Sequence, residues 1–165
     1  MQTIDCIKSR RSVRNYKTDV PSQDSISKII DTALMTPSGK NGQPWRIKLV
    51  YDKQLIDSIS ALSIYESWMK TAPIFMVIYL DKRTSYNYIK DVQACGAFMQ
   101  TIMLTAHDIG LGSCWIGEII ARGEDVNALL NINSFDFELM GIITIGYATN
   151  SPKEVKRKTI RDILL

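Results

Sequence analysis

Hydrophobic residues recur along the chain with two different periods, which predict two kinds of secondary structure. In residues 24–35 the apolar positions follow the spacing of one helix face, and Pro21 and Ser22 precede them as a typical helix start. In residues 45–51 apolar and polar side chains alternate with the period of a strand that has one buried face. Residues 73–80, PIFMVIYL, are apolar throughout and predict a strand covered on both faces.

Similar patterns continue through the rest of the chain. The longest helical pattern covers residues 87–108, and Gly110 is well placed to end it. Shorter patterns predict two helices, one extended piece and one apolar strand, at residues 55–62, 124–131, 113–117 and 139–148. Because helices interleave several strands without an internal repeat or a linker, we expect one α+β domain over residues 1–165, with a mixed central β-sheet flanked by helices.

Composition restricts the classes of function. The chain has 165 residues, 45% of them hydrophobic, and no apolar run approaches the roughly 20 residues that cross a bilayer. Since no signal-peptide pattern is present either, we expect a cytoplasmic protein without a membrane partner. Cys6, Cys95 and Cys114 form no CxxC pair and fit reduced, buried thiols. His107 is the only histidine, which leaves almost no ligands for a zinc site or a hydrolytic triad.

Positive charge is concentrated near the two ends of the chain. Residues 8–17, KSRRSVRNYK, carry five cations and no carboxylate, and residues 153–161 carry a net charge of +4, whereas residues 18–152 carry a net charge of −4. Two basic segments that fold side by side would form either a surface patch or a small anion pocket. A nucleic-acid binder more often spreads its charge along one face, so nucleic acid is the weakest of the candidate partners.

The basic motif RRSVR combines a hydroxyl with three guanidinium groups. Ser12 lies between Arg10 and Arg14 in the sequence, and this combination suits a phosphate, although an isolated basic cluster is more often solvated surface. The glycine-rich GLGSCWIG, residues 110–117, lacks the third glycine of a dinucleotide-binding motif and follows a helix. A helix cap that runs into a strand explains it without a ligand.

The loop TPSGKNGQPW, residues 36–45, carries three uncharged hydrogen-bonding side chains on glycine-containing backbone. Ser38, Asn41 and Gln43 suit the edge of a planar heterocycle better than a phosphate. A tight connection between a helix and a strand explains the same composition equally well.

Considered together, the motifs resemble the FMN-dependent nitroreductase family in order and spacing. They are RRSVR, PSGKNGQPW, AHDIGLGSCWIG and a terminal IGYA followed by KRKTIRDIL, and they cover nearly the whole chain. The resemblance implies a nitroreductase-like α+β fold and an intertwined homodimer with FMN at two interface sites.

The resemblance also implies which residues bind FMN. Those of RRSVR would hold the phosphate, ribityl chain and pyrimidine side, with Arg11 serving either a second phosphate contact or packing. The 37–43 loop would come from the partner subunit, residues 115–117 would lie against the ring, and the terminal basic residues would close on the phosphate. The implied residues are Arg10, Arg11, Ser12, Arg14, Pro37, Ser38, Asn41, Gln43, Trp115, Ile116, Gly117, Arg157 and Lys158.

The implied activity is ping-pong hydride transfer from NADH or NADPH, through flavin N5, to a nitroaromatic, a quinone or a similar small acceptor. No catalytic acid or base is expected among the side chains, because the cofactor carries the chemistry. One alternative is a flavin-binding or sensing module without nicotinamide reactivity, and another is a family branch that removes halogens or fragments the flavin. Residues 60–70 would form either an aromatic lid or a contact to the partner subunit.

Overall fold

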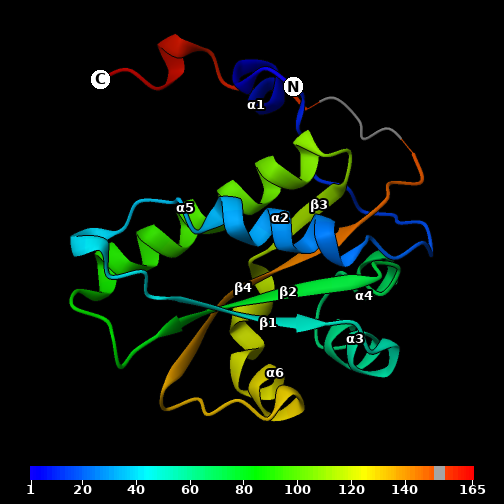
Figure 1. Cartoon of the computed structure of the whole chain (residues 1–165), viewed down its shortest axis with the longest axis vertical. Coiled ribbons are helices and arrows are strands. Elements are labelled where there is room, and N and C mark those ends of the chain that lie inside the picture. Colours follow the sequence, from blue (N-terminus) through cyan, green and yellow to red (C-terminus); the bar gives the residue numbers. More distant parts are fainter. Residues whose placement is uncertain (151–154) are drawn as a thin grey trace.

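The computed structural model describes residues 1–150 and 155–165 of the chain. A four-stranded sheet lies between two groups of helices (Figure 1). The strands are β1 (Trp45–Val50), β2 (Ile74–Asp81), β3 (Gly112–Ile116) and β4 (Phe137–Gly146). The α-helices are α1 (Thr3–Ser9), α2 (Gln23–Ala33), α3 (Lys53–Ser60), α4 (Glu66–Met69), α5 (Tyr88–Asp108) and α6 (Gly123–Leu130), and short 3₁₀ turns cover Gly39–Asn41, Glu118–Arg122 and Ile160–Asp162.

The sheet has the order β1-β2-β4-β3, and each neighbouring pair of these strands is antiparallel. The predicted mixed sheet is therefore wrong for the four strands. After β1 ends at Val50, α3 and α4 return the chain to Phe75 directly beside Val50, so β2 runs back along β1. A period of two predicts that a strand exists, but the return point of its connection sets its direction. A parallel pairing is present in one isolated bridge, between Ser12 and Ser113.

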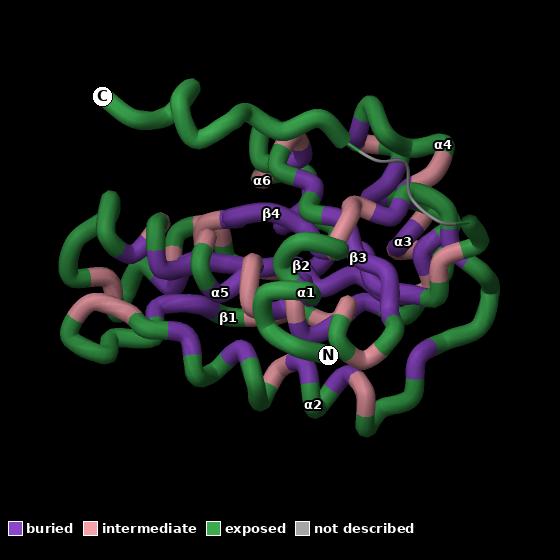
Figure 2. Tube along the Cα trace, turned by 90° about the horizontal axis from the view of Figure 1, so that it is seen from above, coloured by how far each residue is buried: buried purple, intermediate pink, exposed green. Residues whose placement is uncertain are grey.

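Strand β2 separates two hydrophobic cores, and all eight of its residues are buried. Ile74, Met76, Ile78 and Leu80 face α2 and α5, whereas the alternate residues face α3 and α6 on the other side. Figure 2 shows this buried interior in purple beneath an exposed outer surface. The prediction of a strand covered on both faces is confirmed.

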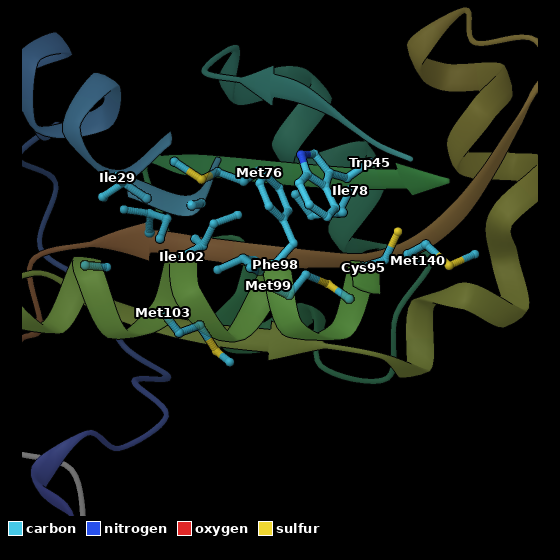
Figure 3. Close-up of a cluster of buried hydrophobic side chains, with 14 of the residues drawn as sticks. Ile29, Trp45, Met76, Ile78, Cys95, Phe98, Met99, Ile102, Met103 and Met140 are labelled. Atoms are coloured by element: carbon cyan, nitrogen blue, oxygen red, sulfur yellow. The ribbon is translucent and has the colours of Figure 1, made fainter. Parts of the chain in front are cut away.

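The core between the sheet and α5 is closely packed around aromatic rings. In Figure 3, Phe98 of α5 points toward Trp45 of β1 and Met76 of β2. The rings of Trp45 and Phe98 are stacked, with centroids 4.6 Å apart. Such a pair adds about 0.5–1.5 kcal/mol to the free energy of its burial, which helps to hold the long helix on the sheet.

The helix ends agree with the sequence signals. The side chain of Ser22 accepts the Ser25 N–H at the start of α2, at 3.2 Å, and Asn87 accepts the Lys90 N–H at the start of α5, at 3.1 Å. Gly110 has a φ of 84°, so it permits the turn from α5 into β3. Helix α1 was not predicted, because its seven residues bury one side chain, Cys6, and show no helical period. No helix of residues 1–150 or 155–165 is both long and apolar enough to span a membrane.

Candidate functional site

The RRSVR motif lies along β3, the outer strand on one side of the sheet. Ser12 pairs with Ser113 in the parallel bridge, and the Val13 N–H donates to the Ser113 carbonyl at 2.9 Å. Both side chains of this second contact are buried. The structure thus brings together two motifs that are about 100 positions apart in the sequence.

A buried tyrosine anchors the far end of this segment. The Tyr16 hydroxyl donates to the Val13 carbonyl at 2.8 Å and lies 2.7 Å from Oγ1 of Thr144, which in turn lies 3.3 Å from the Cys114 carbonyl. The Tyr16 N–H donates to Oγ1 of Thr71 at 3.3 Å. Burial raises the pKa of Tyr16, so its hydroxyl stays protonated at neutral pH. This hydrogen-bond network fixes residues 8–17, which we call the basic segment, against β3 and β4.

A cavity of about 540 Å³ opens beside the basic segment. Every residue from Arg10 to Asn15 lines it, together with Thr149, Asn150, Val155 and Arg157, and none of these lining residues is acidic. We call it the arginine cavity.

Arg10 shows that the arginine cavity suits an anion. Its Nη1 atom is buried and has no hydrogen-bond partner among the described residues. The pKa of Arg10 is lowered, first by burial and then by the charges of Arg157 and Arg11. Leaving a buried cationic donor unpaired is costly, and an oxyanion would both pair with it and offset the repulsion among the three cations. A phosphate group therefore fits the residues that are present.

The segment around α4 joins two parts of the site. The guanidinium of Arg14 is exposed and lies 5.9 Å from the ring centroid of Trp68, which in turn packs at 5.6 Å on Tyr65. The Ser63 hydroxyl donates to the Glu118 carboxylate at 2.8 Å, just beyond β3. These contacts place the 60–70 segment between the basic segment and the end of β3.

The predicted ring-contacting residues differ in their exposure. Trp115 is 38% exposed and Gly117 is exposed, but the Ile116 side chain is buried in the core beneath the sheet. A ligand at this place can therefore contact Ile116 through its backbone. Cys114 is buried as predicted, and burial raises the pKa of its thiol, which makes it a packing residue.

The 37–43 loop lies at the other end of α2 from the basic segment, in cyan in Figure 1. Pro37, Asn41 and Gln43 are exposed, and the Gln43 N–H donates to the Ser38 hydroxyl at 3.0 Å. Lys40, Asn41 and Gln43 have φ values of 54°, 53° and 45°, in the left-handed region that non-glycine residues rarely adopt. One chain by itself does not bring this loop to the arginine cavity.

The terminal basic segment contributes one of its two predicted residues to the cavity. Arg157 lines the arginine cavity and also a separate hollow along residues 156–162, whereas Lys158 lines that hollow and not the arginine cavity. Residues 153 and 154 of the predicted basic cluster lie outside the described part of the chain. Asn15 and Thr149 line the cavity without having been predicted, since single neutral residues carry no motif signal.

Comparisons with known proteins agree with this geometry. The protein-family model described as "Nitroreductase family" matches residues 7–67 and 60–147 of this chain. A protein of Archaeoglobus fulgidus, provisionally named as an NADH dehydrogenase/NAD(P)H nitroreductase, is 30% identical over 158 residues, which cover 92% of this chain and 88% of that protein.

Two solved structures are also similar. A provisionally named nitroreductase from Desulfovibrio desulfuricans, in complex with FMN, has a TM-score of 0.95 and 28% identity, and the match covers 100% of this chain and 96% of that one. A provisionally named NADH oxidase from Clostridium acetobutylicum has a TM-score of 0.88 and 31% identity over 98% of each chain. The family model covers most of the chain, and the fold matches over its whole length, so this chain belongs to the nitroreductase family.

Proposed function

We propose that the chain is an FMN-dependent NAD(P)H oxidoreductase of the nitroreductase type, which acts on a nitroaromatic, a quinone or a similar small acceptor. The observation that carries the proposal is the unpaired, buried Nη1 of Arg10 in a cavity shared with Arg11 and Arg157. Family membership and the FMN complex of the Desulfovibrio relative support the choice of this cofactor. The name of the Archaeoglobus relative supports NAD(P)H as the electron donor.

The residues of the arginine cavity would bind the phosphate end of FMN. Arg10 and Arg157 would donate charged hydrogen bonds to the phosphate, and Ser12 would add a neutral one. Arg14 would favour negative charge at the pyrimidine end of the ring system. Trp68 lies close to the Arg14 guanidinium and limits its freedom.

The bound FMN would supply two-electron redox chemistry, with NAD(P)H and the acceptor reacting in separate half-reactions. The chain contributes a clamp for the cofactor and a surface at Trp115 and Gly117 that is open to contact. His107 takes part in no step. The three free, buried cysteines fit a reducing compartment, so we propose a cytoplasmic location.

We also propose that the working form is an intertwined homodimer in which the 37–43 loop of the partner subunit completes each FMN site. The support is the position of that loop, at the far end of α2 from the arginine cavity, and its left-handed residues. Strained backbone of this kind persists where the surroundings impose it, which fits a loop that presents its polar groups to a ligand.

Cofactor binding is the first test. The protein is incubated with FMN, separated by gel filtration, and examined for a flavin absorption band. We expect Arg10→Ala to weaken FMN binding on the order of 10- to 100-fold, the value of one or two charged hydrogen bonds. Arg122→Ala, at an exposed surface pair with Asp125, is the matched control and should bind FMN normally. A wild-type protein that retains no FMN would refute the proposal.

Turnover separates the alternatives. The FMN-loaded protein is mixed with NADH or NADPH without oxygen, and the loss of the flavin band is followed. Reoxidation is then measured with nitroaromatic, quinone and halogenated acceptors. Bound FMN that neither nucleotide bleaches would indicate a flavin-binding or sensing module, and turnover limited to halogenated acceptors would indicate a dehalogenating enzyme.

The shared site is tested by mixing two inactive variants. Arg14→Ala damages the basic segment and Asn41→Ala damages the loop, so a mixed dimer contains one site free of both changes. We expect the refolded mixture to recover up to about a quarter of the wild-type FMN sites, one in each mixed dimer if half of the dimers are mixed. Recovery no greater than that of either parent would contradict the shared site.

A further inference from the structure

A second cavity, of about 480 Å³, borders the arginine cavity. Arg10 and Arg11 line both cavities, and the second cavity is also lined by Ser9 of α1, His107 of α5 and Ser113 of β3. We call it the histidine cavity. Helix α1 and the end of α5, which supply Ser9 and His107 to this cavity, lie side by side near the start of the chain (Figure 1). None of its lining residues is acidic.

Two residues that line the histidine cavity carry a buried donor without a partner among the described residues, and one of them, Arg10, also lines the arginine cavity. Within the described chain four buried side-chain nitrogen or oxygen atoms lack a hydrogen bond, and two of them, Nη1 of Arg10 and Oγ of Ser113, belong to residues of this cavity. Ser113 is 2% exposed. Buried polar groups are nearly always paired. An anion in the arginine cavity would account for Nη1 of Arg10, so the unpaired Ser113 hydroxyl is the donor that indicates a second ligand that accepts hydrogen bonds.

The charges around His107 favour an anion at the same place. His107 Nε2 lies 2.8 Å from the Ser9 hydroxyl, while the nearby Asp108 carboxylate is paired with the amino terminus of Met1 at 2.8 Å. Burial is the main cause that lowers the pKa of His107, and the positive charges of Arg10 and Arg11 lower it further. The negative charge of Asp108 acts in the opposite direction and raises it. An anion beside Arg10 and Arg11 would reverse the effect of the two cations and favour the imidazolium.

We propose that the histidine cavity is a second oxyanion site, which takes a phosphate-type dianion in addition to the group held in the arginine cavity. Arg10 and Ser113 donate to this anion, and His107 is its proton-linked neighbour. The guanidinium of Arg10 has five N–H donors in a planar fork, so it can serve an anion on each side. The inference does not depend on FMN being the occupant of the arginine cavity.

The test uses the sole histidine as a reporter. The histidine ring signals in the NMR spectrum of the wild-type chain come from His107, and they are followed while inorganic phosphate is added to the FMN-loaded protein and to the FMN-free protein. We expect saturable binding in both forms, weaker in the FMN-loaded protein because the two dianions share Arg10 and repel each other. Glycerol phosphate is titrated in parallel, and its binding would identify an ester as an acceptable source of the dianion, whereas binding of inorganic phosphate alone would assign the site to the free ion.

Variants assign the binding to the cavity. Ser113→Ala should weaken phosphate binding about tenfold or more, because it removes a hydrogen bond to a charged group, with less than a threefold effect on FMN. Ser60→Ala is the matched control, since Ser60 is fully buried and its hydroxyl donates within α3. Sulfate, which keeps its charge between about pH 5 and 8, should bind more tightly as the pH falls, and His107→Gln should abolish this dependence.

The outcomes are distinguishable from those of the proposed function. Phosphate that displaces FMN would show that the two cavities hold one anion between them and would overturn the inference. Ser113→Ala binding phosphate as tightly as the wild type would overturn it as well. Saturable, Ser113-dependent phosphate binding by a protein that cannot retain FMN would support this inference while refuting the cofactor proposal.

Discussion

Replacing Tyr16 by phenylalanine tests whether the buried tyrosine holds the cofactor segment in place. The substitution removes one hydroxyl and keeps the ring. It takes away the donor to the Val13 carbonyl at 2.8 Å and the contact with Oγ1 of Thr144 at 2.7 Å. Because Thr144 still has the Cys114 carbonyl within reach at 3.3 Å, the main loss is one buried carbonyl without its donor.

The size of the effect follows from that loss. A buried group left without a partner costs roughly 1–3 kcal/mol, so we expect Tyr16→Phe to lower the free energy of unfolding by about 2 kcal/mol. For a protein of this length that corresponds to a fall of about 4–8 °C in the melting temperature. Since Val13 also pairs with Ser113 of β3, the basic segment should loosen, and FMN affinity should fall several-fold.

The assay compares two tyrosine variants of the FMN-free protein by urea and thermal unfolding. Tyr79→Phe is the control, because the Tyr79 hydroxyl is also buried but has no partner in the described chain, so its removal should be neutral or stabilising. FMN affinity is then measured for both variants. Equal stabilities for Tyr16→Phe and Tyr79→Phe, or unchanged FMN binding by Tyr16→Phe, would refute the reasoning.

Two further predictions concern stability. Gly141 has a φ of 140°, and a Cβ atom at this position would lie 2.9 Å from Nε1 of Trp115, whereas a Cβ atom at Gly110 would meet no atom within 4 Å. Gly141→Ala should therefore lower the free energy of unfolding by about 1–3 kcal/mol more than Gly110→Ala does. Equal urea midpoints for the two variants would contradict the steric argument. The pKa of Asp81 is lowered chiefly by the hydrogen-bonded Arg83 side chain. The stabilisation from this carboxylate is therefore present above the unfolded pKa and is lost as the pH falls through the folded one. Below about pH 4 the wild type should lose stability more steeply than Arg83→Gln in urea titrations, and parallel pH profiles would argue against this role.

Much of the secondary structure could be predicted from local patterns. The predicted helix at 87–108 is α5, Tyr88–Asp108, and the predicted strand at 73–80 is β2, Ile74–Asp81. Their length and apolar content leave no competing interpretation, and Gly110 ends the helix where only a left-handed residue permits the turn. Helix α1 escaped prediction, because so short a helix depends on packing against α5 rather than on its own pattern.

The candidate site could be predicted in part. The motif RRSVR indicated an anion, and the structure supplies the reason in the unpaired Nη1 of Arg10. The place of Arg157 beside Arg10 depends on the path of the whole chain, as does the separation of Lys158 from it. Neither can be derived from spacing, since 135 positions lie between the two basic segments, residues 8–17 and 153–161.

The sequence alone determined most of the segments that become helices and strands, the concentration of positive charge near both ends, and the family resemblance that the comparisons confirm. These properties depend on residues that are close together in the sequence, because backbone preferences and the period of hydrophobic side chains are local. The tertiary structure decided the antiparallel sheet, the pairing of residues 10–14 with β3, and the two cavities around Arg10. Strand direction, burial and unpaired donors arise from contacts between distant segments, and therefore only the folded chain defines them.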